Sequence, residues 1–157
     1  MTNIRNQNET YLNSLELRQK GSVKCVFTKV DIPKGAILAF MQGDIQDFRD
    51  KHSIQVDENK HLGKSGMIDD ELCHACDANA RIDFSDLSIR AKRDLKAGEE
   101  VAINYCASEE VSANPFHCFC GSKSCYGYVN GFKNLTAEQR LALKDDISPF
   151  LKKKYQL

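Results

Sequence analysis

Cysteines are the residues of this 157-residue chain whose spacing most clearly suggests chemistry. Five of the seven cysteines lie in two short stretches, residues 73–79 (Cys-His-Ala-Cys-Asp-Ala-Asn) and the run Cys118, Cys120 and Cys125. The second stretch has the pattern C-x-C-x₄-C. Zinc binds four soft ligands in a tetrahedron, with Zn–S bonds of about 2.3 Å. Three thiols this close together therefore predict a zinc site, and the alternative is three unrelated buried thiols.

The fourth zinc ligand must come from elsewhere in the chain, and spacing alone does not identify it. A C-x-x-C pair usually supplies two ligands, yet five clustered thiols are one more than a single zinc needs. The first eight residues are polar and contain no apolar signal segment, so we expect metal binding rather than disulfides, with the cytoplasm as the default compartment. The candidate ligands are Cys73, His74, Cys76, Cys106 and His117.

Two further side chains are candidates for chemistry because of where they stand. His74 lies inside the first cysteine stretch, although a single histidine is more often a hydrogen-bonded core residue. Tyr105 ends an apolar run over residues 101–105, which predicts a strand that directs Ile103 and Tyr105 to the same face. The alternative for Tyr105 is a packed aromatic residue.

Many short strands and one late helix are expected to position these residues, so the predicted class is mainly β with some α. Thr136 and Gln139 form a capping-box pattern, which predicts a helix that ends at Ser148. Leu141, Leu143 and Ile147 are expected to form the apolar side of this helix. Residues 106–115 are polar and are expected to be mobile. Phe116 and Phe119 are expected to cover the metal site. The expected strands lie at residues 23–27, 36–41, 53–57, 82–89 and 101–105.

Charge and hydropathy exclude some classes of partner. Lys and Arg together number 22, as do Asp and Glu, so the formal net charge is zero. We therefore expect no general attraction to nucleic acid or to an acidic membrane. No apolar run approaches the roughly 18 residues that a spanning helix needs. The oligomeric state is not indicated.

Three motifs, in this order, resemble those of SET-domain lysine methyltransferases that carry a C-terminal post-SET zinc segment. Residues 72–80 resemble the family pattern R-x-N-H-S-C-x-P-N, with His74, Cys76 and Asn79 in the matching places. Residues 91–105 resemble A-x-R-D-I-x-x-G-E-E-L-x-x-x-Y. The C-x-C-x₄-C run matches the post-SET pattern without gaps.

The resemblance implies a SET-type fold of small curved β-sheets with a pseudoknot, followed by the zinc-binding segment and helix. It implies a domain division into an N-terminal arm at residues 1–20, a SET domain at 21–110, and a post-SET segment with the helix at 111–157. It also implies that Cys76 joins the three later cysteines on zinc, while Cys73 and Cys106 are free thiols.

The resemblance further implies that S-adenosylmethionine and a lysine side chain are the reactants. Tyr105 falls on the family's catalytic tyrosine, and Ile103 and Tyr105 on its lysine channel. The cofactor-binding residues that it implies are Lys24, Cys25, Cys73, His74, Tyr105 and Phe119.

Several positions depart from the family pattern. Cys73 replaces an asparagine that helps to hold the cofactor, and a thiol is a weak hydrogen-bonding group. Residues 23–25 replace a G-x-G, whose glycines allow the backbone to approach the cofactor. Ile103 stands where an aromatic is usual, which should widen the channel. We therefore expect weak cofactor binding.

The leading hypothesis is a zinc-stabilised, S-adenosylmethionine-dependent protein-lysine methyltransferase. Two alternatives stay open. One is a catalytically silent SET-like module that binds a protein partner, favoured by Cys73 and residues 23–25. The other is a methyltransferase that acts on a small amine such as a free amino acid. Retention of His74, Asn79, Glu100 and Tyr105 favours an enzyme.

Overall fold

The computed structural model describes residues 13–157, which fall into two compact units. The first unit comprises residues 13–42, 65–74 and 78–103, and the second comprises residues 43–64, 75–77 and 104–157. Residues 1–12 of the expected N-terminal arm lie outside the described residues. The rest of that arm is structured, because Leu15–Lys20 forms strand β1.

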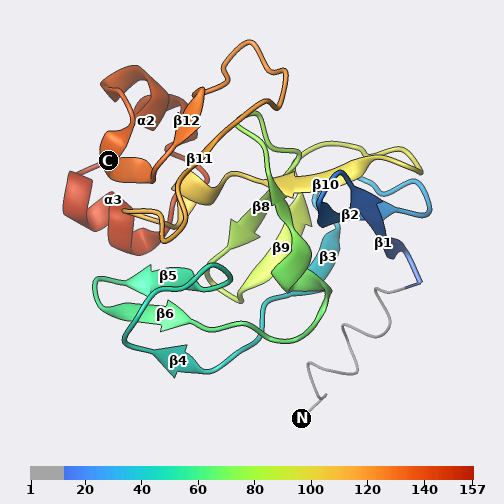
Figure 1. The fold of residues 1–157 in the computed structure, drawn as a ribbon, viewed down its shortest axis with the longest axis horizontal. Coiled ribbons are helices and arrows are strands. Elements are labelled where there is room, and N and C mark those ends of the chain that lie inside the picture. The colour runs from blue at the N-terminus through green and yellow to red at the C-terminus, as the bar shows by residue number, and fades with distance from the viewer. Residues whose placement is uncertain (1–12) are drawn as a thin grey trace. The chain divides into compact units, whose positions relative to one another are not determined.

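The first unit contains two small sheets. One has the strand order β1-β2-β10-β7 and the other the order β3-β9-β8, and Figure 1 shows β8 and β9 side by side. A short 3₁₀ turn, η1 (Ile68–Glu71), precedes β7. The strands are β1, β2 (Val23–Thr28), β3 (Ile37–Phe40), β7 (Cys73–His74), β8 (Ala80–Asp83), β9 (Ser88–Ala91) and β10 (Glu100–Ile103).

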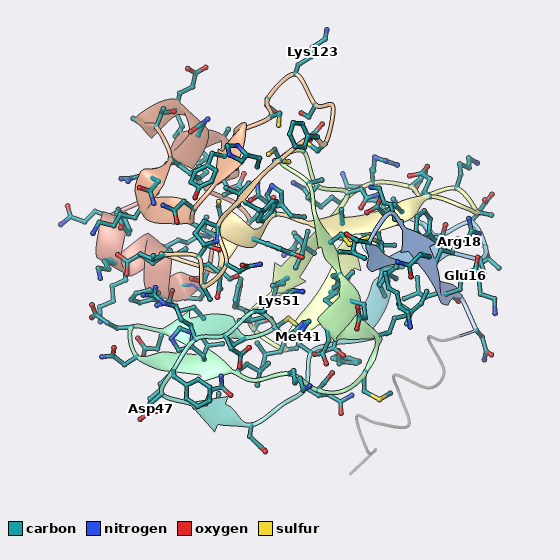
Figure 2. All side chains as sticks on the ribbon, in the orientation of Figure 1. Glu16, Arg18, Met41, Asp47, Lys51 and Lys123 are labelled. Atoms are coloured by element: carbon teal, nitrogen blue, oxygen red, sulfur yellow. A yellow bond between two sulfur atoms is a disulfide. The ribbon has the colours of Figure 1, made fainter. Side chains whose placement is uncertain are left out.

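Strand β1 forms one edge of the four-stranded sheet, and charged side chains mark its exposed face. Arg18 Nε donates to Glu16 Oε1 at 2.6 Å, and the Arg18 guanidinium lies 4.9 Å from the centre of the Phe27 ring. Residues two apart in a strand point to the same face, and Figure 2 shows Glu16 and Arg18 close together on β1. Charges on an edge strand oppose pairing with another chain.

Two similar turns, with the pattern D-[IL]-x-x-G, pair with each other across the first unit. Ile32 and Leu95 exchange both backbone hydrogen bonds at 2.8 Å. The Asp31 carboxylate accepts from the Ala97 N–H at 2.9 Å, and the Asp94 carboxylate accepts from the Lys34 N–H at 2.8 Å. The two turns are thus locked together reciprocally, and the second of them leads directly into β10.

The second unit combines short strands with two helices. Its sheets have the orders β4-β6-β5 and β11-β12, and α2, α3 and β12 are the orange and red elements of Figure 1. Phe132 and Leu151 are completely buried in its apolar core. The elements are β4 (Ile45–Gln46), β5 (Ile54–Asp57), β6 (Lys60–Leu62), η2 (Tyr105–Ala107), β11 (Phe116–His117), β12 (Tyr128–Val129), η3 (Phe132–Asn134), α2 (Ala137–Leu143) and α3 (Pro149–Tyr155).

The mainly β expectation is confirmed, but the late helical region differs from the prediction. The capping box at Thr136 and Gln139 is present, yet α2 ends at Leu143 and a second helix follows. Ser148 begins that helix instead of ending the first, since its hydroxyl accepts from the Leu151 N–H at 3.2 Å. Leu141 is 59% exposed, so it does not belong to the apolar side.

The polar stretch at residues 106–115 is ordered at its start, contrary to expectation. Cys106, Ala107 and Ser108 are buried, and the Ala107 carbonyl accepts from the Ser148 N–H at 2.8 Å. Gly131 has φ 104°, and a Cβ there would meet the Glu110 carbonyl oxygen at 2.5 Å. The stretch therefore packs too closely against its neighbours to tolerate a side chain at Gly131. No helix between residues 13 and 157 is long and apolar enough to cross a membrane.

Candidate active site and thiol cluster

Four cysteine sulfur atoms converge in the second unit. The Sγ atoms of Cys76, Cys118, Cys120 and Cys125 all lie within 4.8 Å of one another, and those of Cys76 and Cys118 are 3.8 Å apart. Four sulfurs bound to one zinc at about 2.3 Å would lie about 3.8 Å apart. The donor set and its spacing therefore fit a tetrahedral metal site.

The hairpin β11–β12 brings the three later cysteines together. The Cys118 N–H donates to the Gly127 carbonyl, and the Cys125 N–H donates to the Ser122 carbonyl, which closes the loop on itself. Figure 2 shows Lys123 at the outer tip of this loop, with sulfur atoms in yellow at its base. A local turn therefore gathers three thiols, and the segment of residues 75–77 supplies the fourth.

Hydrogen bonds fix Cys76 beside the hairpin. The Tyr126 N–H donates to Cys76 Sγ at 3.2 Å. The Asn104 amide donates to the Cys76 carbonyl at 3.2 Å and to the Tyr126 hydroxyl at 2.9 Å. Asn104 and Tyr126 were not expected from the sequence as site residues. The signal for both was adjacency, since Asn104 precedes Tyr105 and Tyr126 follows Cys125.

Burial sets the protonation of the thiols when no cation is bound. It raises the pKa of Cys76 far above its ordinary value and also raises that of Cys118. A dication reverses this preference, because it stabilises thiolates directly. Burial also acts to raise the pKa of Cys120, but hydrogen bonds outweigh it and lower that pKa to about 7. Cys76 and Cys118 therefore disfavour bare thiolates, and a metal ion would stabilise all four sulfurs.

Cys73 was expected to be a free thiol, and that expectation is wrong. Cys73 on β7 forms a disulfide with Cys25 on β2, with the two Cα atoms 5.7 Å apart. The cysteines are 48 residues apart in sequence. The family resemblance assigned only Cys76 of the C-x-x-C pair to zinc and left Cys73 as a free thiol. Sheet pairing, which the sequence did not indicate, brings Cys25 close to Cys73.

The candidate cofactor residues of the first unit lie around this disulfide. Cys73 Sγ is 3.6 Å from the Lys24 carbonyl oxygen. Burial lowers the pKa of His74 to about 4, so the imidazole is neutral at physiological pH. The Asn79 amide donates to the Glu100 carbonyl at 2.7 Å, and its oxygen accepts from the Ala102 N–H at 2.9 Å. The Asn79 side chain thus holds the backbone of β10 in place through two hydrogen bonds.

Tyr105 and Phe119, the remaining candidate cofactor residues, belong to the second unit. Strand β10 ends at Ile103, so Tyr105 stands in the 3₁₀ turn η2 and not on a strand as predicted. Its ring packs edge-to-face on Phe116, with centroids 6.1 Å apart. Phe119 is 91% exposed, so it does not cover the thiol cluster. Ile103, the other predicted channel residue, is buried in β10.

Comparisons with known proteins identify the class. A family model described as "SET domain" matches residues 23–106, more than half of the chain, and the chain therefore belongs to the SET domain family. A solved structure with the same fold, "KRYPTONITE in complex with mCHG DNA and SAH", has a TM-score of 0.62. It is 16% identical, and the match covers 73% of this chain and 28% of that one.

Two curated relatives are more similar in sequence. "Methyltransferase flvH" of Aspergillus flavus is 35% identical over 66 residues, covering 41% of this chain and 37% of the relative. "Histone-lysine N-methyltransferase, H3 lysine-36 specific" of Aspergillus oryzae is 34% identical over 74 residues, covering 43% of this chain and 8% of the relative. The matches thus span 37% or less of the length of these relatives.

Proposed function

We propose that this chain is an S-adenosylmethionine-dependent N-methyltransferase whose substrate is a lysine side chain of a protein. The observation that carries the proposal is the SET domain match over residues 23–106, a range that includes His74, Asn79 and Tyr105. The relatives named as histone-lysine methyltransferases support a lysine substrate.

Two features of the first unit fit a cationic cofactor, although the Glu100 carboxylate also pairs with the Lys20 ammonium. A neutral His74 does not repel a sulfonium group, and the Glu100 carboxylate lies within 4.8 Å of the Cys25 and Cys73 sulfurs. The residues proposed to hold the cofactor are Lys24, Cys25, Cys73, His74, Tyr105 and Phe119. Bound S-adenosylmethionine supplies the methyl group.

Protein residues would then control the amine that accepts the methyl group. A free lysine has a pKa of about 10.4, and an apolar channel with a nearby cation lowers it toward the neutral, nucleophilic form. We propose that Ile103 contributes apolar surface to that channel and that the Tyr105 hydroxyl orients the amine. Alignment of this kind can supply several kcal/mol of barrier reduction.

We propose that zinc bound by Cys76, Cys118, Cys120 and Cys125 stabilises the segment that carries Phe119. The zinc would be structural, because four thiolates complete its coordination and leave no position for substrate.

Titration of the purified chain with S-adenosylmethionine and, separately, with its demethylated product tests the proposal. We expect saturable but weak binding of both, and methyl transfer to lysine-containing proteins in a lysate. Methyl transfer to free amino acids, without transfer to proteins, would mean that the substrate is a small amine and not a protein. Absence of binding at millimolar cofactor would favour a silent protein-binding module, which the substitution of the family's asparagine by disulfide-bonded Cys73 also favours.

A further inference from the structure

The Cys25–Cys73 disulfide lies where β10 changes its pairing partner. Glu100 and Val101 of β10 pair with β2, whereas Ala102 and Ile103 pair with β7. If the β2–β10 register is extended by one residue, Cys25 lies opposite Ala102. In the β7–β10 register, Ala102 pairs with Cys73. Both cysteines therefore belong to the same point of the sheet, and the disulfide joins the two strands there.

Backbone pairing alone holds β7 weakly. The strand has two residues, and its parallel register with β10 consists of two residue pairs. A short parallel pairing of this kind contributes little stability. The disulfide is consequently the strongest connection between β7 and β2, the strands that carry His74 and Lys24.

The two sulfur atoms differ in how easily a reagent reaches them. Cys25 is 1% exposed, whereas Cys73 is partly exposed. An external thiolate can therefore attack Cys73, with Cys25 as the leaving group. The remaining five cysteines belong to the second unit, and none of them is disulfide-bonded.

We propose that Cys25 and Cys73 form a reversible disulfide that controls cofactor affinity, with the oxidised form binding S-adenosylmethionine more tightly. The inference rests on the proposed function, because Lys24 and His74 adjoin the two cysteines and are proposed to hold the cofactor. Unbonded sulfurs cannot remain at bonding distance, so reduction separates the two Sγ atoms and removes the covalent connection between β2 and β7. Groups fixed in their binding positions before the ligand arrives bind it more tightly.

The exchange balances with a low-molecular-weight thiol such as glutathione. One glutathione thiolate attacks Cys73 Sγ, the Cys25–Cys73 bond breaks, and Cys25 leaves as a thiolate that takes up a proton. A second glutathione thiolate then attacks the glutathione sulfur of this mixed disulfide, which forms glutathione disulfide and releases Cys73 as a thiolate that takes up a proton. The protein disulfide is reduced by two electrons, and two glutathione molecules are oxidised to one glutathione disulfide.

The test uses the full chain, loaded with zinc, in glutathione buffers of varied redox ratio. Alkylation followed by mass spectrometry reports the state of Cys25 and Cys73, and calorimetry reports the S-adenosylmethionine Kd. We expect the Kd to rise about tenfold on reduction, within the usual range of coupling between two sites. By reciprocity, saturating cofactor should make the disulfide harder to reduce and lower its midpoint potential by about 30 mV, the equivalent of that tenfold change.

Two variants separate this disulfide from other thiols. Cys106→Ala removes a buried cysteine that is not disulfide-bonded and should keep the full redox response. The double variant Cys25→Ala/Cys73→Ala should bind at one affinity in every buffer. If the double variant does not fold, the cofactor-dependent midpoint of the unaltered chain still decides the question.

An equal Kd in both redox states, or tighter binding after reduction, would overturn this inference and leave the proposed function standing. Alkylation of both Cys25 and Cys73 in the most oxidising buffer would also overturn it, because the disulfide would then not form. A change in Kd that follows the loss of zinc, and not the oxidation state of Cys25 and Cys73, would overturn it as well. Absence of cofactor binding in every buffer would overturn the inference and the proposed function together.

Discussion

Individual polar side chains in the second unit are held in apolar surroundings by a few specific contacts. The Glu109 carboxylate accepts from the Gln55 N–H at 2.9 Å, while the Glu110 N–H donates to the Gln55 side chain. Lys154 and Tyr155 of α3 contact the Glu110 carboxylate. Neighbouring acids thus have different roles, since Glu109 accepts from the backbone of β5 and Glu110 contacts helix α3.

The Tyr105 hydroxyl is the group on which we expect turnover to depend. Tyr105→Phe keeps the ring that packs on Phe116 and removes only the hydroxyl. We expect methyl transfer to fall about 10²-fold or more, with cofactor Kd unchanged, judging from the effect of removing a single preorganised donor. Ile103→Phe would test the width of the channel in the same transfer assay.

Tyr128→Phe is the matched control for Tyr105→Phe, because it removes a hydroxyl from a half-exposed tyrosine on β12. It should leave transfer unchanged. Equal activity of Tyr105→Phe and the unaltered chain would mean that Tyr105 is only a packed aromatic residue.

Glu109 should make stability depend on pH. Burial raises its pKa to about 7 from an ordinary value of 4.5, although the Gln55 N–H, Ser108 and Arg49 act in the opposite direction. The folded chain then holds this proton more tightly than the unfolded chain. The stabilisation is complete below pH 4.5 and is lost as pH rises through 7, by up to about 3 kcal/mol at 1.36 kcal/mol per pKa unit.

Urea unfolding of Glu109→Gln at several pH values measures this effect, since the glutamine oxygen can still accept from the Gln55 N–H. The difference in free energy of unfolding between variant and unaltered chain should change between pH 4.5 and 7. Glu138→Gln, on the exposed side of α2, should show no such change. A constant difference for Glu109→Gln would contradict the raised pKa.

At the scale of elements, this fold relies on short pieces tied by side chains. Most strands have two to four residues. A strand pair of that size has little stability on its own. Asn79 supports β10, the paired turns support each other through Asp31 and Asp94, and the β11–β12 hairpin carries three thiols.

Removal of zinc should therefore release the β11–β12 hairpin. The purified chain should contain about one zinc, since one tetrahedral ion uses four thiolates. Alkylation should spare Cys76, Cys118, Cys120 and Cys125 until a chelator is added. Amide exchange and proteolysis at residues 118–127 should then rise, because binding energy at a structural zinc site is folding energy.

Cys120→Ala should lower the zinc content, and Cys106→Ala should not, which separates a ligand from a buried cysteine outside the cluster. Alkylation of Cys76 in the zinc-loaded chain would contradict the proposed ligand set.

For the whole molecule, the sequence alone determined the local features, whose geometry depends on residues close together in the chain. The C-x-C-x₄-C spacing, the capping box at Thr136, and the glycine turns at Gly35 and Gly98 act over a few residues. Their geometry follows from local backbone preferences. The three ordered motifs were also enough to indicate the SET domain family, and the family match confirms it.

Tertiary structure decided which distant residues meet. Sheet register pairs β7 with β10 and brings Cys73 to Cys25 across 48 residues, so a thiol expected to be free is a disulfide. Strand β10 ends at Ile103 and Tyr105 lies in a 3₁₀ turn, although the run of residues 101–105 looks continuous. The Asn104 side chain at the start of this turn accepts from the Cys106 N–H and donates to the carbonyl of Cys76, which is 28 residues away. Register and packing depend on segments far apart in the chain, and the periodicity of one segment carries no information about its partners.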